Sequence, residues 1–398
     1  MPGRHFLQIP GPTNVPERIL GAMHRPVPDH RGPELPELLS EIVPGLKKIF
    51  QTTRGEIVLF PVSGTGGLES SIVNTLSAGD LVLAFNIGHF SHAYAETARS
   101  FGMQVDEVEL PWGQGVPADL VHDRLIRDTA RNYKAILVVH NETSTGVTSD
   151  VRAVREAINA AHHPALLLVD TVSSLASIEF LFDEWSVDVA VTGTQKGLML
   201  PPGMAVICAG PRALAASGQV NTPRFFFDWR PVLAEMKRGY FPFTPATLML
   251  YGLREAVRML LEEGLPAVFG RHRKLAEGVR RAVRAWNLPI LCRNAAEYSN
   301  SLTAVELPEG IDADKVLQLA QEELNLSLGG GLGRLKGRVI RIGHLGALNE
   351  LEVLAMIAGT EMALQMVGIR IVPGMGVQAC EEWFMQEHLV GRRVGSSR

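Results

Sequence analysis

The chain has 398 residues, which is too long for one small core and long enough for two domains. With 46% hydrophobic and 20% charged residues its composition is ordinary for a globular protein, and a formal net charge of −4 gives nucleic acid or an anionic membrane no electrostatic reason to bind. No apolar run approaches the roughly 18 residues that span a bilayer, and the first residues lack the apolar core of a signal peptide. The three cysteines show no metal-ligand spacing, so we expect a reduced, cytoplasmic setting and no bound metal.

Short apolar segments alternate with amphipathic stretches through the first two-thirds of the chain. We expect strands at 57–60, 81–85, 105–110, 135–139, 165–169, 187–191 and 204–208. Helical patterns lie between them, at 68–76, 91–101, 118–132 and 150–162. Apolar strands with helical crossovers are typical of an α/β fold, with a mostly parallel sheet covered by helices on both faces. Ligands of such folds bind at the carboxyl ends of the strands.

The pattern changes after about residue 265. A long basic helical stretch at 265–286 leads into a region with strands at 301–306 and 338–341 and helices at 312–325 and 349–367. We interpret this region as a second, smaller α+β domain. The predicted organisation is therefore an N-terminal arm (1–20), a large domain (21–265), a small C-terminal domain (266–390) and a polar tail (391–398) that frays.

An acid and a lysine follow two of the expected strands. Asp170 comes directly after 165–169, and Lys196 follows 187–191 in the run Gly193-Thr194-Gln195-Lys196-Gly197. Two strands that deliver these side chains to one edge of a sheet suggest a pyridoxal phosphate (PLP) site. The lysine would hold the cofactor aldehyde as a Schiff base, and the carboxylate would keep the pyridine nitrogen protonated. A lysine in such a partly desolvated pocket has a lowered pKa and can act as nucleophile and base.

Each of these residues also has a simpler interpretation. Asp170 is followed by Thr171-Val172-Ser173-Ser174 and could be a helix N-cap. The apolar surroundings of Lys196 argue against an ordinary surface lysine. A third feature supports the cofactor site: the glycine-rich run Ser63-Gly64-Thr65-Gly66-Gly67 joins a strand to a helix. Glycines let the backbone approach a phosphate, and a helix N-terminus presents unpaired N–H groups to it.

Seven segments in a fixed order carry a resemblance to a known family. They are Pro10-Gly11-Pro12-Thr13-Asn14-Val15-Pro16, Ser63-Gly64-Thr65-Gly66-Gly67, His140-Asn141-Glu142-Thr143-Ser144-Thr145-Gly146, Val169-Asp170-Thr171-Val172-Ser173-Ser174, Gly193-Thr194-Gln195-Lys196-Gly197, Thr244-Pro245 and Arg341-Ile342-Gly343-His344-Leu345-Gly346. In this order the chain resembles class V aminotransferases of PLP fold type I. More narrowly it is similar to the serine–, alanine– and aspartate–glyoxylate enzymes. The resemblance implies a seven-stranded sheet in the large domain.

The resemblance implies cofactor contacts residue by residue. The phosphate would be bound by Thr65, Gly66 and Gly67 with Gln195 beside them, and the ring would be enclosed by Asp170, Val172 and Phe90. Phe90 falls where the family often has a tryptophan, so the face contact is kept and the indole N–H is lost. Either Thr143 or Ser144 corresponds to the hydroxyl near the ring oxygen O3′, and we favour Thr143.

The resemblance also implies a homodimer with shared active sites. Thr244 matches a threonine that reaches the phosphate bound by the partner subunit. The tyrosine that usually accompanies it, three residues earlier, falls on Phe241, with Tyr240 adjacent. This departure from the family pattern puts one phosphate hydrogen bond in doubt.

Arg341 is the residue that the resemblance assigns to the substrate α-carboxylate. A guanidinium suits this role because its planar fork pairs bidentately with a carboxylate. The alternative is a strand-end arginine in a surface ion pair. His30 and Arg31 resemble a segment at the substrate entrance, and His344 follows Arg341 closely, but their roles stay open. If the donor is a dicarboxylic amino acid, Arg31 is a candidate for the second cation it requires.

The resulting hypothesis is a PLP-dependent aminotransferase that passes an amino group from serine, aspartate or alanine to glyoxylate. Lys196 would carry the proton between substrate and cofactor, and the kinetics would be ping-pong. The alternative reaction is a class V lyase of the cysteine desulfurase type, which needs a reactive cysteine on a loop. Cys292 is the only loop-like candidate and has no activating neighbour. A relative that binds PLP without turnover is disfavoured because Lys196 and Asp170 are both present.

Overall fold

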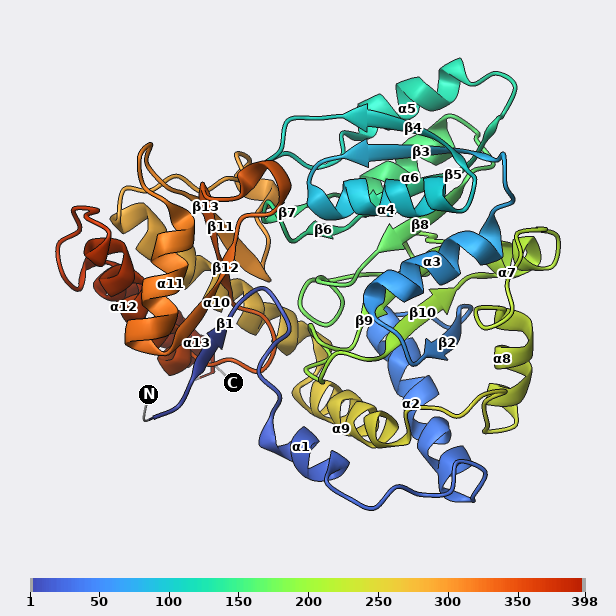
Figure 1. The fold of residues 1–398 in the computed structure, drawn as a ribbon, viewed down its shortest axis with the longest axis horizontal. Helices are drawn as coiled ribbons and strands as arrows, with labels where there is room; N and C mark the ends of the chain where they lie inside the picture. Colours follow the sequence, from blue (N-terminus) through green and yellow to red (C-terminus); the bar gives the residue numbers. More distant parts are fainter. Residues whose placement is uncertain (1–2, 396–398) are drawn as a thin grey trace.

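The computed structural model describes residues 3–395 and arranges them in two lobes, each built on a sheet (Figure 1). The sheet of the large lobe has seven strands in the order β2-β10-β9-β8-β5-β3-β4. In that order the strands are Glu56–Phe60, Ala205–Ala209, Val189–Gly193, Leu166–Asp170, Tyr133–Val139, Leu81–Asn86 and Gln104–Glu109. Strand β10 runs antiparallel to both neighbours and the other pairs are parallel, so the expected mostly parallel sheet is confirmed.

The central strands β5, β8 and β9 are apolar and buried along nearly their whole length. Helices cover them, as this pattern predicts. Helix α3 (Gly64–Thr75) packs against β9 and β10, and α4 (His89–Ser100) packs against β3 and β5. The other helices of this lobe are α1 (Glu17–Met23), α2 (Glu34–Phe50), α5 (Ala118–Arg127), α6 (Val151–Ala160), α7 (Pro211–Ser217), α8 (Trp229–Lys237) and α9 (Thr247–Glu263).

The small lobe contains a four-stranded sheet in the order β1-β12-β13-β11. These strands are Phe6–Gln8, Leu326–Gly330, Val339–Gly343 and Leu302–Glu306. The helices α10 (Leu265–Ala285), α11 (Ala313–Leu324) and α12 (Glu350–Met366) accompany this sheet, and the lobe has a hydrophobic cluster of its own. The sequence did not predict β1 or β12. Strand β1 pairs in parallel with β12, so the beginning of the expected N-terminal arm is part of this sheet.

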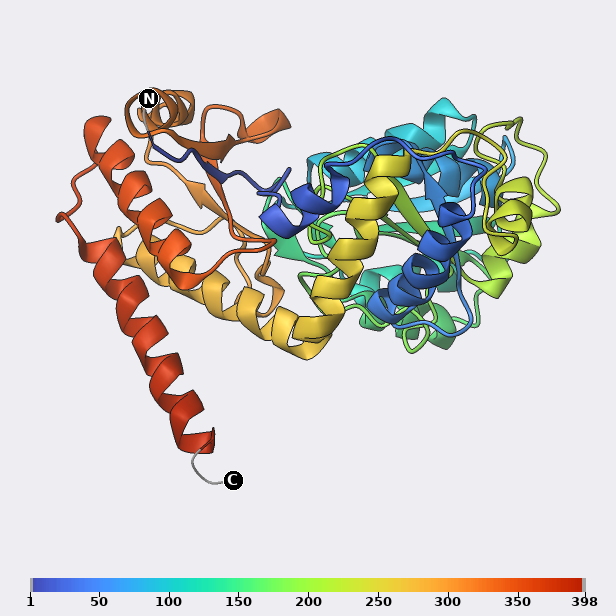
Figure 2. The same cartoon turned by 90° about the horizontal axis from the view of Figure 1, so that it is seen from below.

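The end of the chain differs from the expected frayed tail. Helix α13 (Met375–Gly395) packs against α10 and continues as a helix to Gly395 (Figure 2). Residues 396–398 of the predicted tail lie outside the described residues. Among the described residues, no helix combines the length and the apolar character needed to cross a bilayer.

Besides His163, three histidines, His140, His272 and His344, are buried in these two lobes. Burial lowers the pKa of His140 and His344 to about 3 and that of His272 to about 4. The folded chain therefore keeps all three neutral, whereas the unfolded chain protonates them below a pH of about 6.5. Because the unfolded state then binds more protons, this contribution to stability is complete above pH 6.5 and is lost as the pH falls.

His140 allows a direct test, because its ring packs against Phe180 and Trp185 and its Nδ1 has no hydrogen-bond partner. We expect His140→Phe to flatten the dependence of the free energy of unfolding on pH by about one proton, or ~1.4 kcal/mol per pH unit, between pH 6 and pH 4.5. Denaturant unfolding at several pH values measures this slope. The exposed His24→Phe serves as control and should leave it unchanged. Equal slopes for wild type and His140→Phe would contradict the assignment.

Candidate active site

Lys196 lies in the loop after β9, at the carboxyl end of the large sheet. Its amine is desolvated, which lowers its pKa to about 8, and the positive charge of Arg341 acts in the same direction against the opposing charge of Asp170. The Nζ atom donates a hydrogen bond of 2.5 Å to the carbonyl oxygen of Pro10. A neutral backbone group thus holds the lysine amine. The pKa of this amine lies close enough to neutral pH for part of it to be unprotonated, as a base requires.

Asp170 is the last residue of β8, the strand next to β9, and only 5% of it is exposed. Burial raises the pKa of its carboxyl to about 7; the hydrogen bond from the Val172 N–H, 2.8 Å long, acts against this, and the charge of Glu142 adds to it. The residues after it form turns and not a helix, so the simple N-cap interpretation is wrong. A cationic partner opposite this carboxyl would stabilise its ionised form.

Helix α3 begins at Gly64 with Ser63 as its N-cap. A Cβ on Gly67 would lie 2.7 Å from Val191 Cγ1 and 2.9 Å from Ala205 Cβ, so glycine is required for the first turn to lie directly on β9 and β10. The first N–H groups of a helix lack intrahelical acceptors and attract anions. The Gly67 N–H donates to the Ser63 carbonyl at 3.1 Å, so the helix begins in this turn, and its N-terminal end lies beside the lysine loop in an orientation suited to an anion.

A cavity of about 140 Å³ joins these features. Its lining residues are Ser63, Gly64, Thr65, Leu68, Phe90, Thr143, Asp170, Val172, Gln195 and Lys196. Most of the predicted cofactor residues thus surround one space, with Gly66 and Gly67 in the adjoining turn. Within the part of the chain that the structure describes, the buried Oε1 of Gln195 has no hydrogen-bond partner.

Glu142 is the residue that the sequence analysis missed, although it lies within a quoted motif. It is fully buried, and its carboxylate accepts hydrogen bonds from the N–H groups of Phe90 (3.2 Å), Ser91 (2.8 Å) and Ser144 (3.0 Å). A carboxylate at a helix N-terminus is stabilised by the helix dipole. Glu142 therefore anchors the start of α4 and with it the backbone of Phe90. The Phe90 and Ser91 N–H groups lie 52 and 51 residues away in the chain and are backbone groups, so no sequence pattern indicates this contact.

The same network separates the two hydroxyl candidates. The Ser144 hydroxyl donates to Glu142 at 2.6 Å and accepts from the His89 N–H at 2.9 Å. Thr143 instead lines the cavity and donates to the Ser173 hydroxyl at 3.1 Å. The geometry therefore favours Thr143 as the hydroxyl that faces a ligand.

Arg341 reaches the junction of the lobes from β13 and is 9% exposed. Its Nε donates to the Gly330 carbonyl at 2.6 Å and its Nη1 to the Thr143 carbonyl at 2.9 Å. Burial lowers the pKa of Arg341 to about 10, against the charge of Glu142. Within residues 3–389 it forms no ion pair, so it is not the surface ion pair considered above. A buried guanidinium without a carboxylate partner is suited to bind an anionic ligand.

The remaining candidates lie elsewhere. His344 is enclosed, with its ring nitrogens 3.1 Å from the Asn300 carbonyl and 3.0 Å from the Thr303 hydroxyl, so it does not reach a ligand. Arg31 is exposed and lines a separate hollow with Tyr240 and Phe241. The exposed Thr244 follows that loop and does not line the cavity of its own chain.

Cys292 does not have the properties of a catalytic thiol. It is buried, and burial raises the pKa of its thiol to about 11. Its Sγ donates to the Asn294 carbonyl at 3.4 Å. The lyase alternative therefore lacks its nucleophile here.

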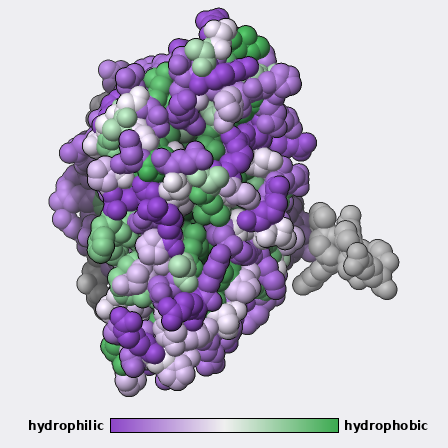
Figure 3. Space-filling view, turned by 90° about the vertical axis from the view of Figure 1, so that its right-hand side faces the viewer, coloured by the Kyte–Doolittle hydropathy of each residue, from purple (hydrophilic) through white to green (hydrophobic). Residues whose placement is uncertain are grey.

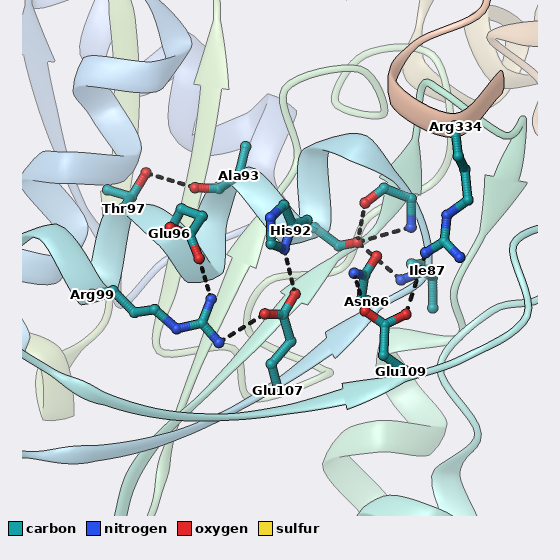
Figure 4. Close-up of polar contacts among 12 residues, drawn as sticks. Asn86, Ile87, His92, Ala93, Glu96, Thr97, Arg99, Glu107, Glu109 and Arg334 are labelled. Atoms are coloured by element: carbon teal, nitrogen blue, oxygen red, sulfur yellow. Dashed lines mark hydrogen bonds and ion pairs between the residues drawn. The ribbon is translucent and has the colours of Figure 1, made fainter. Parts of the chain in front are cut away.

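A polar cluster at the outer edge of α4 and β4 contains side chains of both charges, which pair with one another (Figure 4). His92, Glu96 and Glu107 approach one another closely enough to suggest metal ligands. Arg99, however, pairs with Glu96 and donates to Glu107 at 2.7 Å. The arginine supplies the positive charge that a metal ion would bring, so we interpret this cluster as an ion-pair network.

The residues around the cavity fit PLP on chemical grounds. The helix end with its glycines matches a phosphate, the carboxyl of Asp170 matches a pyridinium nitrogen, and the amine of Lys196 matches an aldehyde. The unpartnered Gln195 oxygen and the apolar Val172 and Phe90 leave room for a polar group and a flat ring between them.

Comparison with known proteins agrees with this site. The family model described as aminotransferase class-V matches residues 13–333, and the chain belongs to this family, whose cofactor is PLP. It is 47% identical over 393 residues to the serine–glyoxylate aminotransferase of Methylorubrum extorquens, covering 98% of each chain. It is 45% identical over 386 residues to the L-aspartate–glyoxylate aminotransferase of Paracoccus denitrificans, covering 97% of this chain and 98% of the relative.

The fold agrees as well. The crystal structure of ureidoglycine–glyoxylate aminotransferase from Bacillus subtilis superposes with a TM-score of 0.89 at 28% identity, covering 97% of this chain and 99% of that one. An apo cysteine desulfurase from Thermococcus onnurineus, with a TM-score of 0.70 and 15% identity over 89% of this chain and 93% of that one, shares the fold alone.

Glu142→Gln tests whether the anchored helix start positions Phe90 for the cofactor. The amide nitrogen cannot accept an N–H, so one backbone donor loses its acceptor at a cost of ~1–3 kcal/mol. We expect the apo-protein to bind PLP roughly tenfold or more weakly, with altered visible dichroism of the bound cofactor. Ser144→Ala keeps the carboxylate and its three N–H partners and should change both quantities less. An unchanged affinity and dichroism in Glu142→Gln would exclude this role.

Proposed function

We propose that this protein is a transaminase that passes an amino group from a small L-amino acid, serine, aspartate or alanine, to glyoxylate, giving glycine and a 2-oxo acid in a ping-pong reaction. The observation that carries the proposal is the common position of Lys196, Asp170 and Arg341 around one buried junction. The relatives named above, at 45–47% identity over nearly the whole chain, support glyoxylate as the amino acceptor.

The chemistry divides between cofactor and protein. When bound, PLP supplies an electron-withdrawing ring that stabilises negative charge at the substrate α-carbon. Lys196 would hold the aldehyde, and its amine would carry the proton that leaves the substrate α-carbon. Its pKa of about 8 leaves a usable fraction of neutral amine near neutral pH. Asp170 keeps a proton on the pyridine nitrogen, and Phe90 covers one face of the ring. Thr143 faces the ring hydroxyl.

The binding of the substrate carboxylate falls to Arg341. Its buried charge lacks a carboxylate partner within the described residues, and a planar guanidinium accepts a carboxylate through two parallel hydrogen bonds. Phosphate binding falls to Thr65, Gly66, Gly67 and Gln195 at the start of α3.

A homodimer completes the site in this proposal. Thr65 is exposed at the edge of the cavity, and Thr244, exposed in its own chain, is the residue that the family pattern directs to the partner's phosphate. Figure 3 shows apolar side chains among polar ones on one face of the large lobe. Phe225 of this lobe is 96% exposed. An exposed aromatic of this kind is typical of an interface.

Two further assignments, of the domain boundaries and of the cellular location, accompany the proposal. We assign 21–265 and 266–390 as separate domains, in keeping with the two hydrophobic clusters. We also assign a cytoplasmic location, in keeping with three buried free thiols, Cys208, Cys292 and Cys380.

The reaction is tested by the visible absorption of the PLP-loaded protein. We expect one of L-serine, L-aspartate and L-alanine, added singly, to remove the visible band, and glyoxylate to restore it with formation of glycine. Lys196→Ala should still associate with PLP and show no such cycle, because it lacks both the covalent attachment and the proton carrier. Arg341→Leu should need a much higher donor concentration to remove the visible band, because it lacks the guanidinium that binds the substrate α-carboxylate. A band that no donor changes, or that glyoxylate does not restore, would refute glyoxylate transamination.

Shared active sites are tested by mixing two inactive or impaired variants. In a hybrid of Lys196→Ala and Thr244→Ala subunits, one site has both wild-type residues if Thr244 acts across the interface. We therefore expect activity to rise on subunit exchange above the sum of the parent proteins. If Thr244 acts within its own chain, each hybrid site carries one substitution and no activity is regained. Sedimentation of the mixture verifies that hybrids of dimer size have formed.

A further inference from the structure

The segment that follows β1 passes between the two lobes directly against the lysine loop. Thr13 binds this loop twice, with its N–H donating to the Gln195 carbonyl at 3.0 Å and its hydroxyl donating to the Lys196 carbonyl at 3.2 Å. The carbonyl of Pro10 accepts the third hydrogen bond, from Lys196 Nζ at 2.5 Å. Three contacts thus fix the lysine loop and the end of its side chain to one short stretch of chain.

Gly11 lies within this stretch and touches the lysine closely. Its φ is +104°, in a region that side-chain-bearing residues rarely adopt. A Cβ added there would overlap Cδ, Cε and Nζ of Lys196, and these three atoms are its nearest neighbours. The absence of a side chain at position 11 is therefore what lets the amine of Lys196 reach the Pro10 carbonyl.

The other side of the segment is fixed to the small lobe. Strand β1 pairs with β12, and a Cβ on Gly329 of β12 would come within 2.7 Å of Pro10 Cδ. Gly343, at the end of β13, would overlap the Ile9 carbonyl in the same way. Gly329 is also the register partner of Arg341. Pro10 thus follows β1 directly, and the sheet that contains β1 also carries Arg341, so the small lobe supports both the Pro10 carbonyl and the guanidinium.

We propose that the Pro10 carbonyl is the group that holds the Lys196 amine whenever this amine is not bonded to the cofactor, and that Gly11 is a positioning residue that keeps this place open. This inference rests on the proposed function, because it assigns Lys196 a free state and a cofactor-bound state. The amine of Lys196 is desolvated, and without a neighbouring acceptor its hydrogens would be left unpaired in the interior. The small lobe thereby positions the lysine as well as the substrate clamp.

A double-mutant cycle on PLP binding to the apo-protein tests the proposal without using any substrate. We expect Gly11→Ala to strengthen PLP binding roughly tenfold, because it destabilises the free state of the Lys196 amine and leaves the cofactor-bound state unaffected; an effect of this size is within the range of coupling for residues in contact. In a Lys196→Ala background the same substitution should have no effect, since the atoms it would displace are gone. Gly310→Ala is the matched control, because Gly310 has a φ of +85° and no atom within 4 Å of an added Cβ. It carries the backbone strain alone and should leave PLP affinity unchanged.

Thermal unfolding of each apo-variant shows whether the chain folds. If Gly11→Ala does not fold, Thr13→Val provides the second test: it removes the hydroxyl bond to the Lys196 carbonyl and so loosens the segment whose Pro10 carbonyl holds the free amine. It should strengthen PLP binding severalfold, and only in the background that has the Lys196 amine. Equal effects of Gly11→Ala with and without Lys196, or equal effects of Gly11→Ala and Gly310→Ala, would overturn the proposal. If the Gly11–Lys196 coupling is observed but the wild-type protein does not react with glyoxylate, the proposed function is refuted and the role of Pro10 and Gly11 stands.

Discussion

Four ionisable side chains lie where the two sheets meet, and the site depends on how their charges are accommodated. Lys196, Asp170, Glu142 and Arg341 are all withdrawn from water, and within residues 3–389 none forms an ion pair. Backbone groups hold each of them: carbonyl oxygens accept from the two cations, and N–H groups donate to the two carboxylates. Burying such charges is costly unless polar groups replace the lost water.

This arrangement leaves the charges available for ligands. Had Arg341 been paired with Glu142, a substrate carboxylate would have had to displace a carboxylate of the protein. Instead the guanidinium needs an anion and the carboxyl of Asp170 needs a cation, and each has a pKa displaced toward its neutral form, to about 10 and about 7. A ligand that brings the missing opposite charges relieves this desolvation. The stability that these buried charges cost is recovered as binding free energy when a ligand supplies the opposite charges, a common compromise at functional sites.

The sequence predicted the large sheet and the positions of Asp170 and Lys196 well. The reason is that each buried strand of a parallel sheet is a short apolar run, and a polar residue at its end is visible in the local sequence. The remaining parts of the site have no such pattern. Strand β1 has three residues, and its partner β12 lies more than three hundred residues later, so local sequence does not reveal the pairing. Glu142 acts on backbone N–H groups, and Pro10 acts through its own carbonyl; neither role depends on a recognisable side-chain motif. His344 became a candidate because it is near Arg341 in sequence. In the fold its side chain is enclosed by Asn300 and Thr303.

The hydrogen bonds of Arg341 also determine how a substrate can enter. Its Nη1 bonds the Thr143 carbonyl of the large lobe, and its Nε bonds the Gly330 carbonyl of its own lobe. These bonds use two of the five N–H groups of the guanidinium and leave one on Nη1 and both on Nη2 for a carboxylate. Pro10 follows β1 of the sheet that carries Arg341, so the small lobe supports both the guanidinium and the acceptor of the Lys196 amine. The charge of Arg341 also lowers the pKa of Lys196, so the two cations act on each other without a direct contact.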